Sequence, residues 1–319
     1  MRIQNVACVG AGLIGASWAS LFVMRGCKVT LQDLNEELLD KAVARVRRYC
    51  NFLAEQGIVV GQDPDIVVGQ MRTTTSAKDA VESADYVQES TFESYDVKKP
   101  VFKEVDAAAP DSTIVATSSS GLLISKLQKV TRNPSRFIGA HPFNPPHLIP
   151  LVELIKGKQT SVDTVTRTFE FMKAIGKVPI ILKKEVPGYA ANRLAEALWR
   201  EAIDLVDRGV ASVEDVDKAV TASIGLRWAI MGPHLTYHLG GGEKGMAGFI
   251  EQFGPNMSTW WKSMRTWTTI RPAAARKVVK GIQSTEMVRS KTLEELERWR
   301  DLKLAKLLKV QREGPLDTS

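Results

Sequence analysis

The fold of this chain is decided by a stretch near its start, Val6-Ala7-Cys8-Val9-Gly10-Ala11-Gly12-Leu13-Ile14-Gly15. Its apolar beginning is typical of a buried strand and leads into the pattern Gly-x-Gly-x-x-Gly, after which residues 16–23 continue as a helix. Gly10 permits a tight turn, Gly12 allows a pyrophosphate to approach the backbone, and Gly15 lets the helix lie close to the strand. The helix N-terminus offers N–H groups and partial positive charge to phosphates. The stretch therefore predicts a dinucleotide-binding turn formed by Gly10, Ala11, Gly12, Leu13, Ile14 and Gly15.

An acidic residue follows the second predicted strand. This strand, Lys28–Gln32, ends at Asp33, which lies 18 residues after Gly15 and so close to the spacing of about 20 that is typical of such sites. A carboxylate there accepts hydrogen bonds from a ribose 2′-hydroxyl and repels a 2′-phosphate, so Asp33 predicts NAD rather than NADP. The alternative is a glycine-rich turn in another kind of α/β domain.

Length and composition indicate a globular protein of two domains. The chain has 319 residues, a net charge of +7 and three cysteines without a Cys-x-x-Cys pattern. The odd cysteine count favours a reducing cytoplasm over a disulfide scaffold or a zinc site. No apolar run is long enough to span a membrane, and the early strand leaves no room for a signal peptide. Because the positive charge is spread along the chain, we expect anionic small molecules rather than nucleic acid as partners.

Strands alternate with helices over the first part of the chain. After a loop containing Gly57, Gly61 and Pro64, further strands are predicted near residues 84–89, 113–116, 136–141, 151–155 and 178–182. This alternation predicts an α/β fold, a Rossmann-type, doubly wound and mostly parallel sheet, over residues 1–186.

The pattern becomes helical after Glu185-Val186-Pro187-Gly188. We expect one long helix over Tyr189–Asp207, a second from the capping box at Ser212 to near Gly225, and a last one from Thr292 to Gln311. The last helix carries an apolar stripe that we expect to be buried, made of Leu296, Trp299, Leu304, Leu307 and Leu308. The sequence therefore predicts an all-α C-terminal domain over residues 187–319.

Polar residues cluster where the predicted strands of the sheet end, which is where ligands of such sheets bind. They are the serines of residues 118–120, His141 with Asn144, and Glu153, and Asn192 opens the long helix. Histidine is well suited to take a proton from a hydroxyl near neutral pH, and a carboxylate fixes its tautomer. The twelve-residue spacing between His141 and Glu153 fits two strands joined by a proline-rich turn. The alternative is a histidine with a purely structural role.

Three other histidines, His147, His234 and His238, have no such partner in the sequence and are interpreted as structural. His234 and His238 are four residues apart and could share a helix face. No third ligand is evident, so no metal site is predicted.

Five sequence motifs together resemble the 3-hydroxyacyl-CoA dehydrogenase family in order and spacing. They are GAGLIG, ATSSSGLL, GAHPFNPP, LVELI and VPGYAANRL. The resemblance implies hydride transfer from an L-3-hydroxy acid derivative to NAD, and a homodimer formed through the helical domain. It also implies that His141 is the general base, Glu153 its partner, and that Ser120 and Asn192 contact the reacting oxygen. The implied cofactor contacts are Asp33, Glu93, Lys98, Ser120 and Asn144.

The sequence departs from the family members that use CoA. Where those carry a serine and a lysine for CoA, a gapless count from Asp33 gives Tyr49 and Gln56. Strings such as GLRWAIMGP and LTYHLGGG are similar instead to a branch that oxidises L-carnitine to 3-dehydrocarnitine. Asn192 departs from that branch, which often has an acid there. L-gulonate 3-dehydrogenases (lambda-crystallin), acyl-CoA enzymes and a crystallin-like NADH-binding protein without turnover are the alternatives.

A trimethylammonium substrate needs aromatic faces, each contributing roughly 0.5–2 kcal/mol, and an acid nearby. Glu196 and Trp199 follow Asn192 at spacings that place all three on one helix face. Arg193 or Arg227 is suited to pair with the substrate carboxylate. The alternative is that the aromatic residues belong to the domain core. The candidate substrate residues are Phe143, Glu196, Trp199, Arg227 and Trp228.

Overall fold

The computed structural model describes residues 3–312, and the chain divides into two compact units, Met1–Arg193 and Leu194–Ser319. The predicted domain boundary at residue 186 lies in the segment that joins the last strand to the long helix. Residues 313–319 of the predicted second domain lie outside the described residues.

Eight strands of the described chain form one sheet in the order β3-β2-β1-β4-β5-β6-β7-β8. Every neighbouring pair is parallel except β6 and β7, which run antiparallel. The predicted Rossmann-type, mostly parallel sheet is confirmed. The strands are β1 (Asn5–Val9), β2 (Lys28–Gln32), β3 (Arg72–Thr74), β4 (Tyr86–Glu89), β5 (Ile114–Thr117), β6 (Phe137–Pro142), β7 (Leu151–Lys156) and β8 (Val178–Leu182).

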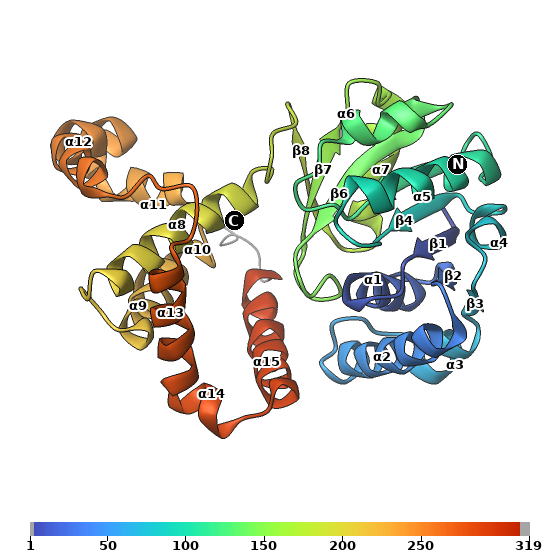
Figure 1. Ribbon diagram of the computed structural model, residues 1–319, viewed down its shortest axis with the longest axis horizontal. Coiled ribbons are helices and arrows are strands. Elements are labelled where there is room, and N and C mark those ends of the chain that lie inside the picture. The colour runs from blue at the N-terminus through green and yellow to red at the C-terminus, as the bar shows by residue number, and fades with distance from the viewer. Residues whose placement is uncertain (1–2, 313–319) are drawn as a thin grey trace. The chain divides into compact units, whose positions relative to one another are not determined.

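Helices cover both faces of the sheet, as expected for a doubly wound fold (Figure 1). On one face, buried residues of α4, α5 and α6 join Ala7, Val87 and Val115 in one apolar cluster. On the other face, Phe22 of α1 and Phe171 of α7 pack against Tyr86. The helices of this unit are α1 (Leu13–Met24), α2 (Glu36–Glu55), α3 (Pro64–Gly69), α4 (Ala77–Val81), α5 (Tyr95–Ala108), α6 (Ile124–Leu127), η1 (Gln128–Val130), η2 (Pro134–Arg136) and α7 (Val162–Ala174).

Part of the stretch expected to be a loop after α2 is regular structure. Asp63 caps α3 by accepting hydrogen bonds from the backbone N–H groups of Asp65 and Ile66. The strand β3 has only three residues and no hydrophobic side chain, so its own sequence gives no strand pattern. Its pairing with β2 makes it a strand, and the prediction of a plain loop was wrong here.

The second unit is helical, as predicted. The helix α8 begins at Ala191 rather than at Tyr189, because Tyr189 has φ +52° and lies in the left-handed region. The helix capped by Ser212 continues past the predicted end near Gly225 through a π-helical turn. The helices are α8 (Ala191–Asp207), α9 (Val213–Ala219), η3 (Val220–Ile224), α10 (Gly225–Trp228), α11 (Pro233–Gly240), η4 (Gly242–Lys244), α12 (Gly245–Ser263), α13 (Pro272–Ser284), α14 (Glu286–Ser290) and α15 (Leu293–Arg312).

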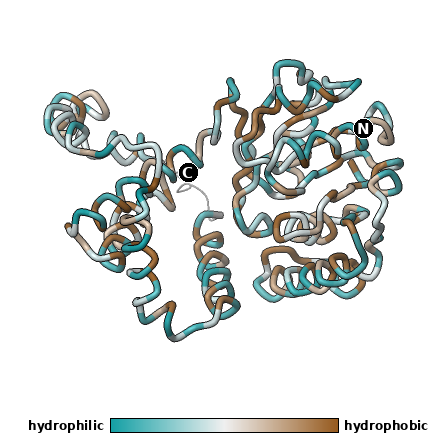
Figure 2. The backbone as a smooth tube through the Cα atoms, viewed as in Figure 1, coloured by the Kyte–Doolittle hydropathy of each residue, from teal (hydrophilic) through white to brown (hydrophobic). Residues whose placement is uncertain are grey.

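The last helix, α15, has an apolar stripe that is only partly buried. Hydrophilic and hydrophobic segments alternate along it (Figure 2). Leu308 is buried, but Trp299 is 43% exposed and Leu307 is 46% exposed. The expectation of a fully buried stripe was therefore wrong for these two residues. None of the helices described in residues 3–312 is long and apolar enough to cross a membrane.

Candidate active site

The glycine-rich turn joins β1 to α1 at the carboxyl end of the sheet. Gly10 has φ +91°, which a residue with a side chain rarely adopts. A Cβ at Gly15 would lie 1.8 Å from the carbonyl oxygen of Gly10, so α1 packs directly against the turn. No atom lies within 4 Å of a Cβ built on Gly12, and no side chain caps α1 there. The turn therefore leaves open space beside the N-terminus of α1, where an anion is stabilised.

Asp33 follows β2 beside this turn. One carboxylate oxygen accepts a hydrogen bond from the backbone N–H of Ala11 at 2.7 Å, and the other accepts one from Leu34 at 2.7 Å. Asp33 is thus fixed against the glycine-rich turn while its side chain stays partly exposed. An oriented carboxylate next to open space fits a ribose with two free hydroxyls. These residues fit the adenosine and pyrophosphate of NAD.

His141 and Glu153 face each other across the antiparallel strands β6 and β7. The His141 Nδ1 and the Glu153 Oε2 are 2.8 Å apart, and the two residues are 3% and 0% exposed. The rings of Phe143 and Tyr189 pack edge-on against the imidazole at 4.8 and 5.5 Å. The predicted pair is therefore hydrogen bonded and held in one orientation by aromatic neighbours.

The loop before α8 completes the surroundings of Glu153. Its Oε1 accepts hydrogen bonds from the backbone N–H groups of Ala190 and Ala191, at 3.0 and 2.9 Å. Burial raises the pKa of Glu153, but the hydrogen bonds from His141, Ala191 and Ala190 outweigh burial and hold the pKa below its usual value. Glu153 is thus a carboxylate at neutral pH. These two N–H groups follow Tyr189, whose φ of +52° is left-handed, and lie at the start of α8, where the backbone N–H groups have no partner within the helix.

A serine-containing loop after β5 is organised by Glu93. The Glu93 Oε1 accepts hydrogen bonds from the Ser119 hydroxyl at 2.7 Å and from the backbone N–H groups of Ser120 and Gly121 at 2.7 and 3.2 Å. The Asn192 amide donates to the carbonyl oxygen of Ser120 at 3.0 Å. The structure thus brings together Glu93, Ser120 and Asn192, three of the predicted site residues.

Lys98, a predicted cofactor contact, is enclosed by protein. Its side chain is 1% exposed, and its ammonium donates to both carboxylate oxygens of Glu89, at 2.8 and 3.0 Å, and to the Thr91 carbonyl oxygen. Its distance to the Glu93 Oε2 is 3.6 Å. Sequence reasoning missed Glu89 as a site residue. The sequence did offer one indication, since Glu89 is a charged residue at the end of a strand, β4, that is otherwise expected to be buried.

The loop between β6 and β7 carries Phe143 and Asn144, and hydrogen bonds from the buried Lys177 hold it in place. The Lys177 ammonium donates to the carbonyl oxygens of Pro146 and, at 2.7 Å, Ile149. It also lies 4.9 Å from the ring centre of Trp18. Burial, with the charge of Arg25 nearby, lowers the pKa of Lys177 to about 7. His147 of this loop is buried against Ser17 and Tyr49, in keeping with its structural interpretation.

The remaining candidate substrate residues belong to the helical unit. Glu196 and Trp199 lie on α8, and Arg227 and Trp228 end α10. Trp199 is 49% exposed and Trp228 is 38% exposed, so neither is a core residue. All four belong to the unit Leu194–Ser319, whereas His141 belongs to the unit Met1–Arg193.

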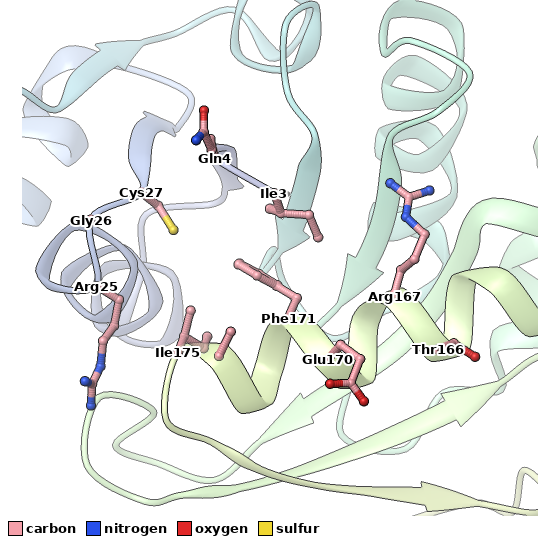
Figure 3. Close-up of a pocket in the computed structure, with 11 residues that line it drawn as sticks. Ile3, Gln4, Arg25, Gly26, Cys27, Thr166, Arg167, Glu170, Phe171 and Ile175 are labelled. Carbon is pink, nitrogen blue, oxygen red and sulfur yellow. The ribbon is translucent and has the colours of Figure 1, made fainter. Parts of the chain in front are cut away.

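A cavity of about 400 Å³ lies elsewhere, at the amino ends of β1 and β2 (Figure 3). The apolar side chains of Ile3, Phe171 and Ile175 line it together with Cys27. It shares no residue with the predicted site and lies at the opposite end of the strands. No group of three His, Cys, Asp or Glu side chains within residues 3–312 is arranged to hold a metal ion.

Comparison with protein families covers both units of the chain. The NAD-binding domain of 3-hydroxyacyl-CoA dehydrogenase matches residues 5–186, and the C-terminal domain of the same enzymes matches residues 188–281. The chain belongs to the 3-hydroxyacyl-CoA dehydrogenase family. It is an NAD-dependent dehydrogenase of that family, and the predictions of family, cofactor and enzyme class are confirmed.

Individual relatives span nearly the whole chain. An L-carnitine dehydrogenase of Streptomyces coelicolor is 41% identical over 82% of this chain and 80% of its own length. One from Oceanobacillus iheyensis is 36% identical over 96% of this chain and 97% of its own. Among solved structures, an NAD-dependent 5-formyl-3-hydroxy-2-methylpyridine 4-carboxylic acid 5-dehydrogenase has a TM-score of 0.85 and 30% identity, covering 98% of this chain and 99% of that one.

Proposed function

We propose that the protein oxidises L-carnitine to 3-dehydrocarnitine with NAD. The observation that carries the chemistry is the buried His141–Glu153 pair at the carboxyl end of the sheet. The substrate is supported by the two L-carnitine dehydrogenases that align with most of the chain. Bound NAD supplies the hydride acceptor.

His141 acts as the general base. Glu153 is a carboxylate that can only accept hydrogen bonds. The His141 Nδ1 is therefore assigned the ring proton and donates a hydrogen bond to Oε2. The opposite ring nitrogen, Nε2, is then unprotonated and takes the proton of the 3-hydroxyl group. Glu153 stabilises the imidazolium that forms, as carboxylates do in comparable base–orienter pairs.

Ser120 and Asn192 position the reacting oxygen. Glu93 fixes the backbone of Ser120, and Asn192 fixes its carbonyl oxygen, so the Ser120 hydroxyl has a defined place from which to donate to the substrate. A donor held in advance stabilises negative charge on the reacting oxygen. On the cofactor side, we assign the glycine-rich turn and Asp33 to the adenosine diphosphate part, and Glu93, Ser120 and Asn144 to the nicotinamide part.

Aromatic faces suit the trimethylammonium group of carnitine. Phe143 lies beside His141, and the exposed rings of Trp199 and Trp228 in the helical unit are further candidates, with Glu196 as counter-charge and Arg227 for the carboxylate. Tyr49, which stands where CoA-using members carry a serine, is buried and stacked on His147 at 4.1 Å. This packing disfavours a CoA ester as substrate.

A homodimer formed through the helical unit is the second part of the proposal. Several large apolar side chains of this unit are exposed, including Trp260 at 55% and Trp261 at 65%. Contiguous exposed apolar patches mark interaction sites, and these adjacent tryptophans of α12 are the candidates for one. A light-scattering mass of one 35.2 kDa chain at working concentration would contradict it. The odd number of cysteines, with Cys8 and Cys50 as buried thiols, supports a cytoplasmic location.

The substrate is tested by NADH formation with L-carnitine, D-carnitine, L-gulonate and L-3-hydroxybutyryl-CoA side by side. We expect turnover with L-carnitine and none with its D isomer, because His141 addresses one face of the carbinol. Phe143→Leu should then raise KM for L-carnitine, whereas Phe169→Leu, a partly exposed phenylalanine of α7 outside the site, should leave it unchanged. Turnover confined to gulonate or to the CoA ester would overturn the substrate and leave the family chemistry standing.

A further inference from the structure

Two buried residues at the ends of neighbouring strands form one hydrogen-bonded unit beneath the site. Glu89 and Thr117 are register partners on β4 and β5, and both are 0% exposed. The Thr117 hydroxyl donates to the Glu89 Oε2 at 2.5 Å. The Glu89 Oε1 accepts from the backbone N–H and the hydroxyl of Thr91, which leads into the segment that carries Glu93. Glu89 therefore contacts both loops that form the nicotinamide side.

The Thr117 hydroxyl continues this unit into the serine loop. Its oxygen also accepts a hydrogen bond from the backbone N–H of Ser119 at 3.1 Å. The Ser119 hydroxyl in turn donates to Glu93 at 2.7 Å and accepts from Leu122 at 3.1 Å. Because Ser120 follows directly, its backbone N–H reaches the same Glu93 oxygen at 2.7 Å.

We propose that Thr117, anchored by Glu89, is a positioning residue that couples the Thr91–Glu93 loop to the Ser118–Ser120 loop. This inference deepens the proposed function, since it rests on the roles assigned above to Ser120 and Glu93. Thr117 touches neither substrate nor cofactor in this arrangement; it acts through Ser119.

A hydroxyl group is the chemistry this position requires. It is both a donor and an acceptor, so one small side chain satisfies a buried carboxylate and an N–H group at once. Valine has nearly the same shape and lacks both functions. In Thr117→Val, one Glu89 oxygen loses a donor and the Ser119 N–H loses an acceptor, and the serine loop is released from the strand.

The test compares Thr117→Val with Thr113→Val. Thr113 is also 0% exposed, lies just before the other end of β5, and donates its hydroxyl to the Ala84 carbonyl oxygen at 2.6 Å. It is therefore a matched control for loss of a buried hydroxyl. Each variant is measured for melting temperature, for NADH dissociation constant by fluorescence, and for kcat and KM. Thr117→Ser is the conservative rescue.

We expect Thr117→Val to weaken NADH binding and to lower kcat about tenfold each, as for loss of a hydrogen bond to a charged group. Thr113→Val should lower the melting temperature similarly and change neither value, and Thr117→Ser should restore both. Equal NADH affinity in the two valine variants would overturn the coupling. Since NADH binding needs no substrate, this result is independent of whether L-carnitine is the substrate. Lack of L-carnitine turnover in the unmodified enzyme would count against the proposed function alone.

Discussion

Glu153 and Glu89 are both fully buried carboxylates at the carboxyl end of one sheet, yet their surroundings differ. Glu153 pairs across antiparallel strands with His141 and accepts hydrogen bonds from two backbone N–H groups. Glu89 pairs with Lys98 and with two threonine hydroxyls. The imidazole of His141 is the base of the proposed reaction, whereas the Lys98 ammonium is an ion-pair partner.

The difference teaches that burial alone does not define a catalytic carboxylate. In the proposed function, the charge of Glu153 stabilises the imidazolium that forms when His141 takes up a proton. The positive charge of Lys98 balances the negative charge of Glu89. This ion pair links the neighbouring loops rigidly. The partner of each carboxylate decides its role, and substitutions at both sites separate the two roles.

The largest effect is expected for His141→Gln. Glutamine keeps a polar side chain but cannot take up a proton, so kcat should fall by up to roughly 10⁴-fold. NADH affinity, measured by fluorescence titration, should stay within about twofold because the dinucleotide turn is untouched. Unchanged turnover would remove His141 from the role of base.

Glu153→Gln should reduce kcat by about 10³-fold. The amide NH₂ group would donate to the His141 Nδ1 and so place the imidazole proton on Nε2, where it blocks proton uptake from the substrate. Glu170→Gln, an exposed glutamate on α7, is the control for charge loss. A loss of turnover in both variants alike would point to a general electrostatic effect instead.

Glu89→Gln is expected to act on stability. It leaves the buried Lys98 ammonium with only the more distant Glu93 carboxylate, at 3.6 Å, as counter-charge, and loss of a buried ion-pair partner costs up to roughly 3–5 kcal/mol of unfolding free energy. The double variant Glu89→Gln/Lys98→Met, which removes both charges, should recover most of this loss in urea unfolding. If the double variant is no more stable than the single one, the ion pair is not what Glu89 contributes.

Asp33→Asn should lower the preference for NAD over NADP by roughly 10- to 100-fold, the range for a hydrogen bond to a charged group. The asparagine retains an acceptor for the Ala11 N–H, so the turn keeps its support. The kcat/KM ratio for the two cofactors measures the effect, with the exposed Asp40→Asn as control. An unaltered ratio would argue against a ribose contact.

The smallest effect concerns Lys177, a buried lysine that donates to two backbone carbonyl oxygens, whereas Lys98 pairs with the Glu89 carboxylate. With a pKa of about 7 in the folded protein against an ordinary value of 10.5, the unfolded chain binds more protons between these limits. The unfolding free energy therefore rises with pH across this window, by up to about 1.4 kcal/mol per pH unit. Lys177→Met should flatten this slope in melting curves at pH 7 and 9, whereas the exposed Lys173→Met should not.

The sequence predicted the sheet and the His141–Glu153 pair because both depend on local sequence patterns. Alternating strands and helices define the fold, and twelve residues with a proline-rich turn suffice to bring His141 beside Glu153. The hydrogen-bonded group around Glu89 was not predicted because its partners come from three separate segments of the chain. A glutamate at position 89 does not by itself indicate that Lys98 and Thr117 are its partners. Likewise β3 exists only through its pairing with β2, and the helical pattern of the sequence does not reveal the left-handed turn at Tyr189, two residues before α8 begins.

The antiparallel hairpin of β6 and β7 has a consequence for engineering. Its register fixes His141 opposite Glu153, while the connecting segment carries Phe143, which packs on the imidazole, and Asn144. In the proposed function, proton transfer and substrate selection thus depend on neighbouring parts of one short element. Loops of altered sequence grafted between the two strands should change which alcohol is admitted, as long as they keep an aromatic ring at position 143 against the imidazole, because strand pairing alone sets the rest of the His141–Glu153 geometry.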